Sequence, residues 1–336
     1  MFRKILAILC IGCVALTASF ANGASEAKAA GGAPSIKRIS IGTAGTAGSL
    51  YPMGVGMAKT ITDHVDGIAC TGEATAASVE NIRNLTNGKL AMGISQSEIA
   101  YLAYNGLGDF KGHQATDLRA LFSTITSYIQ AFALAGSGIN SIADFKGKVV
   151  GCSAAGSGGE MCVRMILNYY GLTYDDIKPQ FISESDAVSA LKDGRIDAFI
   201  CTHPLKSAPL VDLTTSAKVK MFSFDDPAFY KEFFFWKPYT IPAGFYDGVN
   251  EAITVPTSRI TMCTSTKSGL SDEQVYQIVK AIWDNRSEWS GVAKSVSTQA
   301  VFATATDGIP IVMHPGAVRY FKEKGVEIDP SLIPQN

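Results

Sequence analysis

Short apolar runs alternate along the first part of the chain with segments whose apolar residues recur at helical spacing. The runs typical of strands lie at residues 39–43, 68–73 and 90–95. The helical patterns that follow them begin near Pro52, at Ser78 and at Ser97. Strands that alternate with helices in this way predict an α/β fold.

A β-rich stretch at residues 118–135 separates this series from a second one. The second series has predicted strands at residues 149–152, 180–182 and 196–201. Its predicted helices cover residues 159–170 and a short segment capped by Ser185. The aromatic, Pro-rich residues 227–256 show no clear period.

Three further elements are predicted near the C-terminus. Residues 259–264 have the pattern of a strand that returns to the first series. Ser271 and Gln274 form a capping box before an amphipathic helix, and a last helix is expected at residues 315–324, with His314 before it as a cap.

Two strand–helix series joined by paired extended crossings predict two α/β lobes with a hinge. We place lobe I at residues 36–125 and 255–336, and lobe II at residues 126–254. Ligands of such sheets bind at the carboxyl ends of strands, and a cleft between lobes is a preferred place for a pocket.

The first residues have the pattern of a secretory signal peptide. Arg3 and Lys4 precede an apolar core at residues 5–16, which is shorter than the about 20 residues that span a bilayer. We expect cleavage after Ala21 or a few residues later, a disordered leader at 22–35, and a periplasmic product. A retained membrane anchor and a lipid-modified Cys13 are the alternatives.

Composition excludes several classes of protein. The chain has 336 residues, 47% of them hydrophobic and 18% charged, with a net charge of -1. These values predict a large core and about two domains, and exclude a nucleic-acid binder with a basic face. Cys70, Cys152, Cys162, Cys201 and Cys263 follow the predicted signal peptide. We interpret them as buried thiols, with a Cys152–Cys162 or Cys152–Cys201 bridge as the alternative.

Loops rich in small and hydroxyl residues lie where predicted strands end and helices begin. They cover residues 42–52, 75–78, 96–97, 155–159 and 202–204. Free N–H groups at a helix start attract anions, but one terminus contributes at most about 2 kcal/mol. Micromolar binding needs about -8 kcal/mol. Several loops must therefore converge on one small anion.

Signatures of other functions are missing from the sequence. The glycine loops lack the spacing of a dinucleotide site and no GK[ST] follows them. Neither GxSxG nor HExxH occurs, so we predict no enzyme activity, metal or cofactor. His203 is the one histidine on a predicted cleft loop, where ligand contact and local packing are both open. Residues 233–236 are aromatic and favour core packing over a membrane-contacting patch.

Several of these loops and their neighbours resemble a known family. The runs are IGTAGTAGSLYPMG, GEATAASVENIRNL, ISQSEIAYLAYNG, SIADFKGKVVGCSAAGSGGE and MHPGAVRYFKEKG. In this order they resemble the TAXI family, the extracytoplasmic solute-binding subunits of tripartite ATP-independent periplasmic (TRAP) transporters. The resemblance covers nearly all of residues 38–326.

The resemblance implies a Venus-flytrap fold, the type II periplasmic-binding-protein fold with a β-strand hinge. It implies capture of glutamate, a related amino acid or a dicarboxylate, and delivery to an integral-membrane TRAP permease. Matching the family's motifs gives these ligand-binding residues: Thr46, Gly48, Ser49, Tyr51, Ser78, Asn81, Gln96, Ser97, Ser157, Gly158 and Thr202. His203 is added because the sequence there departs from the family, as does the AGTAG of the first loop.

Two other functions stay open at this point. One is a binding protein that feeds an ATP-driven importer, and the other is a periplasmic enzyme on the same bilobal scaffold. A nucleophile–base pair in the cleft would favour the enzyme, whereas hydroxyl and amide groups favour a carrier.

Overall fold

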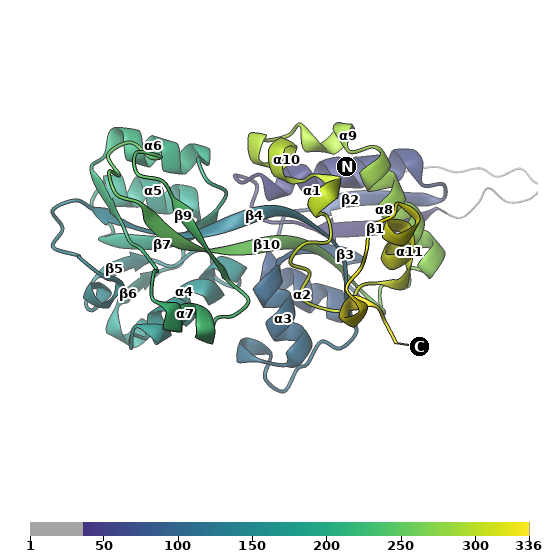
Figure 1. Ribbon diagram of the computed structural model, residues 1–336, viewed down its shortest axis with the longest axis horizontal. Coiled ribbons are helices and arrows are strands. Elements are labelled where there is room, and N and C mark those ends of the chain that lie inside the picture. The colour runs from purple at the N-terminus through teal and green to yellow at the C-terminus, as the bar shows by residue number, and fades with distance from the viewer. Residues whose placement is uncertain (1–35, 336) are drawn as a thin grey trace, which may run out of the picture. The chain divides into compact units, whose positions relative to one another are not determined.

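Ten strands of the computed structural model join into one sheet that runs through both halves of the described chain (Figure 1). The structure describes residues 36–335, so the predicted signal peptide and leader lie outside the described residues. The order of the sheet is β2-β1-β3-β10-β4-β7-β5-β6, with β8 on β4 and β9 on β10. The strands are β1 (Lys37–Gly42), β2 (Ile68–Glu73), β3 (Met92–Gln96), β4 (Leu118–Leu134), β5 (Val149–Gly151), β6 (Lys178–Gln180), β7 (Ala198–His203), β8 (Val219–Met221), β9 (Lys237–Ile241) and β10 (Ile253–Ser265).

The long strands β4 and β10 connect the two halves. They pair antiparallel from Tyr128–Thr257 to Leu118–Ser265, with two register shifts on the way. At one end β10 pairs with β3, and at the other it pairs with β9. The predicted strand at residues 259–264 was therefore too short, because β10 begins in the second half, at Ile253.

Each half has its own parallel strands and covering helices, as the alternating pattern predicted. The first lobe holds β1, β2 and β3 in parallel. Its helices are α1 (Leu50–His64), α2 (Ser78–Thr86), α3 (Ser97–Asn105), α8 (Asp272–Asp284), α9 (Ser287–Ser290), α10 (Lys294–Gln299) and α11 (Pro315–Glu323), with 3-10 turns η1 (Gly108–Phe110), η4 (Phe302–Thr304) and η5 (Pro330–Leu332).

The second lobe holds β5, β6 and β7 in parallel. Its helices are α4 (Gly158–Tyr169), α5 (Glu184–Lys192), α6 (Ala208–Ser216) and α7 (Pro227–Glu232), with 3-10 turns η2 (Ile142–Phe145) and η3 (Tyr174–Asp176). Figure 1 shows this lobe on the left, joined to the first by β4 and β10.

The hydrophobic cores follow the same division. One large cluster takes its residues from positions up to 125 and from 260 onward, and Met161 of α4 joins it from the second lobe. Two smaller clusters lie between residues 129 and 255. The exact lobe boundaries at 125/126 and 254/255 stay a prediction.

Helix starts follow local sequence signals. Ser271 and Gln274 form the expected capping box of α8, and His314 Nδ1 accepts a hydrogen bond from the Gly316 N–H at the start of α11. The predicted cap at Ser185 is wrong, because Ser183 Oγ accepts from the Asp186 N–H and α5 begins two residues earlier than expected. The strand predicted at residues 180–182 is also two residues too late, because β6 covers Lys178–Gln180.

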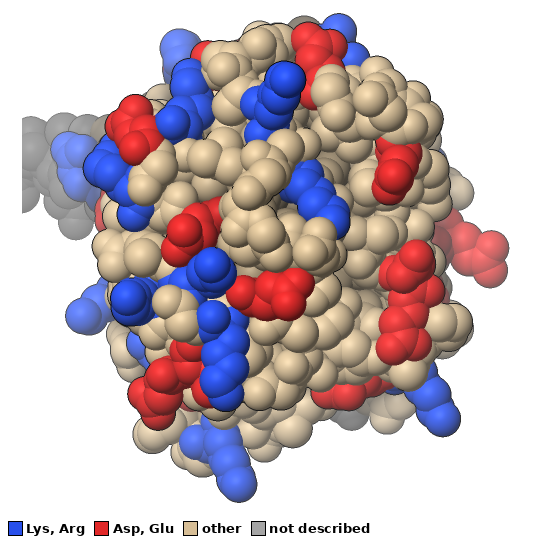
Figure 2. Space-filling model, turned by 90° about the vertical axis from the view of Figure 1, so that its left-hand side faces the viewer, with Lys and Arg blue, Asp and Glu red and all other residues tan. Residues whose placement is uncertain are grey.

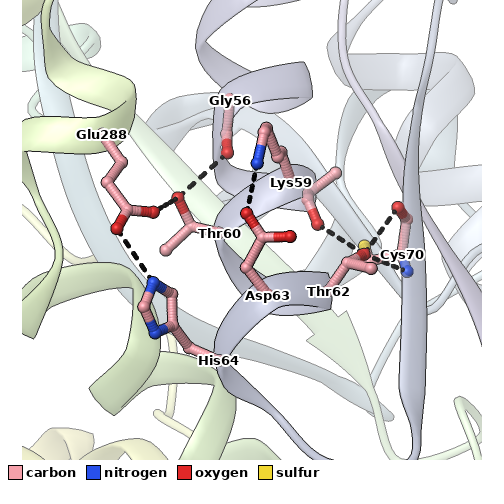
Figure 3. A network of polar contacts seen from close by, with 9 residues as sticks. Gly56, Lys59, Thr60, Thr62, Asp63, His64, Cys70 and Glu288 are labelled. Carbon is pink, nitrogen blue, oxygen red and sulfur yellow. Dashed lines mark hydrogen bonds and ion pairs between the residues drawn. The ribbon is translucent and has the colours of Figure 1, made fainter.

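Polar contacts hold the last turns of helix α1 in place (Figure 3). Glu288 of α9 accepts a hydrogen bond from Thr60 and lies 2.9 Å from His64 Nε2, so it ties the last turns of α1 to a distant segment. Thr62 contacts the backbone of Cys70 on β2. These contacts help to set the direction of α1, whose opposite end faces the cavity described below.

The five cysteines of the described residues are free and buried. Burial raises the pKa of Cys70, Cys152 and Cys263 to about 12, so these thiols stay protonated and unreactive at neutral pH. The interpretation as buried thiols fits the structure, and neither bridge considered from the sequence is formed.

The surface of the second lobe shows Lys, Arg, Asp and Glu scattered among uncharged residues (Figure 2). On the face that this view shows, neither positive nor negative charge dominates. Within residues 36–335, no helix is both long and apolar enough to cross a membrane. In the aromatic segment Phe233 and Trp236 are buried, whereas Phe234 is exposed.

Candidate functional site

A cavity of about 170 Å³ lies between loops of the first lobe and loops of the second. The first lobe contributes the loop before α1, the loop before α2 and Gln96 at the end of β3. The second contributes the starts of α4 and α5 and the end of β7. Isoleucines from the two crossing strands and β3, at positions 94, 125 and 260, form an apolar part of the wall.

Helix starts dominate the polar part of the wall. Ser49 precedes α1, Ala77 precedes α2, Ser157 caps α4 and Ser183 caps α5. Each start leaves backbone N–H groups without helical partners, and the helix dipole favours negative charge there. No lysine or arginine side chain lines this cavity among the described residues.

The loops of the first lobe are held in place by buried polar contacts. Asn81 Nδ2 donates to the carbonyl groups of Gly42, Thr43 and Ile94, at 3.1, 2.8 and 2.9 Å. Asn81 is fully buried, so one side chain ties α2 to the ends of β1 and β3. These bonds fix the positions of the two loops and thereby of the cavity wall.

Between residues 36 and 335, three residues other than glycine have positive φ angles, and all three lie at or next to the cleft. They are Ala77 (φ 76°), Ser153 (φ 61°) and Lys206 (φ 53°). Ala77 lines the cavity, and Ser153 follows β5 and lies beside Gly159. Such conformations cost about 1–3 kcal/mol each and are found mainly at functional sites.

A buried carboxyl group lies behind the cavity wall. Glu98 of α3 is fully buried and accepts hydrogen bonds from Gln96 Nε2 at 3.0 Å, from Cys162 Sγ at 3.2 Å and from Ser258 Oγ. Burial raises the pKa of Glu98, and the hydrogen bonds from Ser258 and Cys162 oppose that rise. Cys162 belongs to α4, so the cluster joins the two lobes directly behind Gln96.

An ion pair also joins the lobes. Arg164 of α4 donates to both carboxylate oxygens of Asp109 in η1, at 2.8 and 2.6 Å. The Arg164 guanidinium lowers the pKa of Asp109 by hydrogen bonding and by its charge. A paired fork of this kind fixes geometry as well as charge, so it holds α4 against the first lobe.

The structure brings most of the sequence-predicted residues to the cavity. Gly48, Ser49, Ser78, Gln96, Ser157, Gly158, Thr202 and His203 line it. Thr46 lines an adjoining cavity of about 630 Å³, which shares Gly48, Ser49 and His203 with the first. Asn81, Tyr51 and Ser97 line neither cavity. Their contact with a ligand, like that of the others, stays a prediction.

Sequence reasoning missed two parts of the site. The start of α5, with Ser183, Glu184 and Ser185, lies in the cavity wall. The adjoining cavity includes Lys206 and Lys294, which lie on segments that showed no binding pattern. The serines around Glu184 at a helix start were the only available signal for the first part.

The polar surface of the cavity carries few titratable groups among the described residues. Hydroxyl groups, backbone amides and the Gln96 amide make up most of its polar surface, and Glu184 and His203 are its titratable groups. Across residues 36–335 no cluster of three or more His, Cys, Asp or Glu side chains is suited to a metal ion.

Comparison with protein families gives a match over most of the chain. Residues 41–325 match the model of the NMT1-like family. The chain belongs to the NMT1-like family. The match includes all the loops that form the cavity.

Solved structures show the same fold at low sequence identity. The chain is similar to PhnD1 from Prochlorococcus marinus (MIT 9301), solved with methylphosphonate, at 10% identity and a TM-score of 0.51, with 86% of this chain and 98% of that chain covered. It is also similar to a protein from Bordetella bronchiseptica RB50, at 19% identity and a TM-score of 0.51, with 89% and 85% covered. The fold is the two-lobed periplasmic-binding-protein fold.

Proposed function

We propose that this protein is an extracytoplasmic solute-binding protein that captures a small organic anion for a membrane transporter. The observation that carries the proposal is the cavity wall, where four helix starts from both lobes meet and no lysine or arginine of residues 36–335 is present. Backbone N–H groups and hydroxyls bind an anion without the strong fixed charge that would hinder its release. The family and the fold agree with this function.

The proposed ligand is a carboxylate of the size of an amino acid or a small dicarboxylate. A cavity of about 170 Å³ with an apolar side suits a short carbon chain better than a sugar or a nucleotide. The methylphosphonate of the PhnD1 structure is likewise a small organic anion. Phosphonates and sulfonates therefore belong in the test panel beside carboxylates.

The proposed transporter is a TRAP permease, on the strength of the ordered TAXI-like motifs between residues 38 and 326. In that arrangement the binding protein delivers its ligand to an integral-membrane permease driven by an ion gradient. A binding protein of an ATP-driven importer has the same fold, so the energy source has to be measured.

The first experiment is a thermal-shift panel of amino acids, mono- and dicarboxylates, phosphonates and sulfonates. A ligand at about 100 times its Kd adds about 2.7 kcal/mol to the free energy of unfolding, which raises Tm by several degrees. We expect a carboxylate or an amino acid to give this shift. If no compound of the panel raises Tm and the protein converts one of them to a product, the protein is an enzyme instead.

The second experiment separates the two kinds of transporter. The protein is reconstituted with proteoliposomes that contain the membrane subunits encoded beside its gene, and uptake of the ligand is followed. We expect uptake to need an ion gradient and to proceed without ATP. Uptake that needs ATP would replace the TRAP proposal and leave the binding function intact.

A further inference from the structure

The cavity wall, whose helix starts favour anions, also contains the carboxylate of Glu184. Glu184 is the first residue of α5, and its side chain is 28% exposed. None of the described residues donates a hydrogen bond to its carboxylate. The Nε2 atom of His203 lies 3.9 Å from Glu184 Oε2. The cavity wall thus combines helix starts that favour negative charge with one fixed negative charge.

The helix itself does not require Glu184. An acidic residue near a helix start stabilises the helix, but α5 has a second one, Asp186. Ser183 Oγ donates to Asp186 Oδ2 at 2.7 Å, so the cap interaction is made by Asp186. Glu184 is the acidic residue of that turn which lines the cavity.

A second acceptor in the wall is also without a donor. Gln96 Nε2 donates to Glu98 Oε1 at 3.0 Å, so the nitrogen end of the amide is used behind the wall. The other end, Oε1, accepts no hydrogen bond from any residue between 36 and 335, although Gln96 is only 5% exposed. Gln96 lines the cavity, so a donor supplied by the ligand would satisfy this acceptor.

His203 completes this part of the wall. Its Nε2 is buried and has no hydrogen-bond partner among the described residues, and it faces Glu184 across 3.9 Å. A gap of that length between two unsatisfied polar groups is too long for a direct hydrogen bond. A ligand group between them would bond to both.

We infer that the ligand is a zwitterion, an amino acid whose carboxylate lies at the helix starts and whose ammonium group is bound by Glu184. This inference rests on the proposed function and selects one ligand class within it. A dicarboxylate places a second negative charge in a cavity that already holds one. An ammonium group instead gives Glu184 its missing donors. Glu184 is then the residue that determines specificity between an amino acid and the corresponding acid without nitrogen.

The test compares matched pairs of ligands on the same protein by isothermal titration calorimetry. The probes are L-glutamate with 2-oxoglutarate, L-leucine with 4-methyl-2-oxopentanoate, and L-alanine with pyruvate. Wild type is expected to bind the amino acid of the responding pair at least ten-fold more tightly. Glu184→Gln is expected to lose at least ten-fold for the amino acid and to bind the oxo acid as well as wild type, or better.

Glu251→Gln is the matched control, because Glu251 is an exposed carboxylate outside both cavities. It should leave both affinities unchanged. Glu184→Asp keeps the charge and is used if Glu184→Gln lowers Tm; it should retain the preference for the amino acid.

The outcomes separate this inference from the proposed function. Tighter binding of the oxo acid, or an amino-acid affinity that Glu184→Gln leaves unchanged, overturns the inference while the protein remains a carboxylate carrier. If no carboxylate, phosphonate or sulfonate binds at all, the proposed function fails and the inference with it.

Discussion

Gly158 at the start of α4 packs directly against Gln96 at the end of β3. A Cβ atom added at Gly158 would lie 2.1 Å from Gln96 Oε1 and 2.6 Å from Ser78 Oγ. Gln96 and Ser78 belong to the first lobe, and hydrogen bonds hold both side chains: Gln96 Nε2 donates to Glu98, and Ser78 Oγ accepts from the Gln96 N–H. The absence of a side chain at Gly158 is what lets the two lobes meet around the cavity.

Gly158→Ala is therefore expected to hold the lobes apart. Ligand affinity should fall at least ten-fold, while the free energy of unfolding without ligand should change by less than about 1 kcal/mol, because each lobe keeps its own core. Calorimetry measures the affinity, and small-angle X-ray scattering measures the separation of the lobes.

Gly291→Ala is the control for this change. Nothing lies within 4 Å of a Cβ added at Gly291, which is exposed. It should leave both affinity and scattering unaltered. Wild-type affinity in Gly158→Ala would show that the contact with Gln96 is not needed for binding.

Glu98 gives a prediction about pH. Burial raises its pKa in the folded protein above the about 4.3 of an exposed glutamate, so the folded state prefers the protonated form. The stability that this preference contributes is fully present below that value and is lost as pH rises through the folded pKa.

Glu98→Gln imitates the protonated group at every pH. The variant should match wild type near pH 4 and exceed its free energy of unfolding at pH 8 by roughly 1–3 kcal/mol, because no charge is left buried. Urea unfolding at both pH values measures the difference. Glu251→Gln should show no such dependence, and a Glu98→Gln protein less stable than wild type at pH 8 would contradict the reasoning.

The Arg164–Asp109 pair is expected to contribute to ligand binding because it joins the lobes. Both side chains are about one-third exposed, so their interaction is worth at most about 1 kcal/mol. Arg164→Met should weaken ligand binding up to about five-fold. The matched control is Lys192→Met, since Lys192 and Asp212 pair at 2.9 Å within the second lobe and should affect stability alone.

Salt and acid should act differently on that pair. Its Asp109 carboxyl has a lowered pKa, so the stabilisation is present above about pH 3.9 and is lost only as pH falls through the folded pKa. The loss of ligand affinity caused by Arg164→Met, up to about five-fold, should therefore be the same at pH 5 and at pH 8. It should shrink in 1 M salt, where the screening length falls to about 3 Å.

Ala77 predicts a stabilising substitution. Its φ of 76° and ψ of -138° are unfavourable for a residue with a Cβ atom, and the loop is held by Thr75 Oγ1, which accepts from the Ala77 N–H at 3.0 Å. Ala77→Gly removes the steric strain, and the free energy of unfolding should rise by about 1 kcal/mol after the entropic cost of glycine. Ala76→Gly, without that strain, should lower it by up to about 1 kcal/mol.

The elements with strong periodicity were predicted well from the sequence. The span of β2 at residues 68–73 agrees with the apolar run, and α8 agrees with its capping box. Helices α6 and α10 were missed, since both are short and α10 has a single buried residue, Val296. Contacts with the rest of the fold, not their own pattern, determine these helices.

The cavity loops were predicted because a strand–helix turn places its small residues at the carboxyl end of a sheet. The direction of each side chain was not predictable. Ser78 and Asn81 lie three residues apart on one face of α2. Ser78 lines the cavity, whereas the side-chain amide of Asn81 donates hydrogen bonds to three backbone carbonyls. Glu184 was overlooked because an acidic residue at a helix start has an ordinary structural explanation.

Strands β4 and β10 run beside each other, and Tyr128 lies opposite Thr257 in their register. All the intervening chain therefore leaves the first lobe and comes back to it at neighbouring points, like an insertion in a single site. The wall that carries Ser157, Glu184 and His203 belongs to that insertion. Replacing the segment between β4 and β10 with that of a relative would therefore change one side of the ligand-binding cavity. The first lobe, which forms the other side, and the two joining strands would keep their sequence.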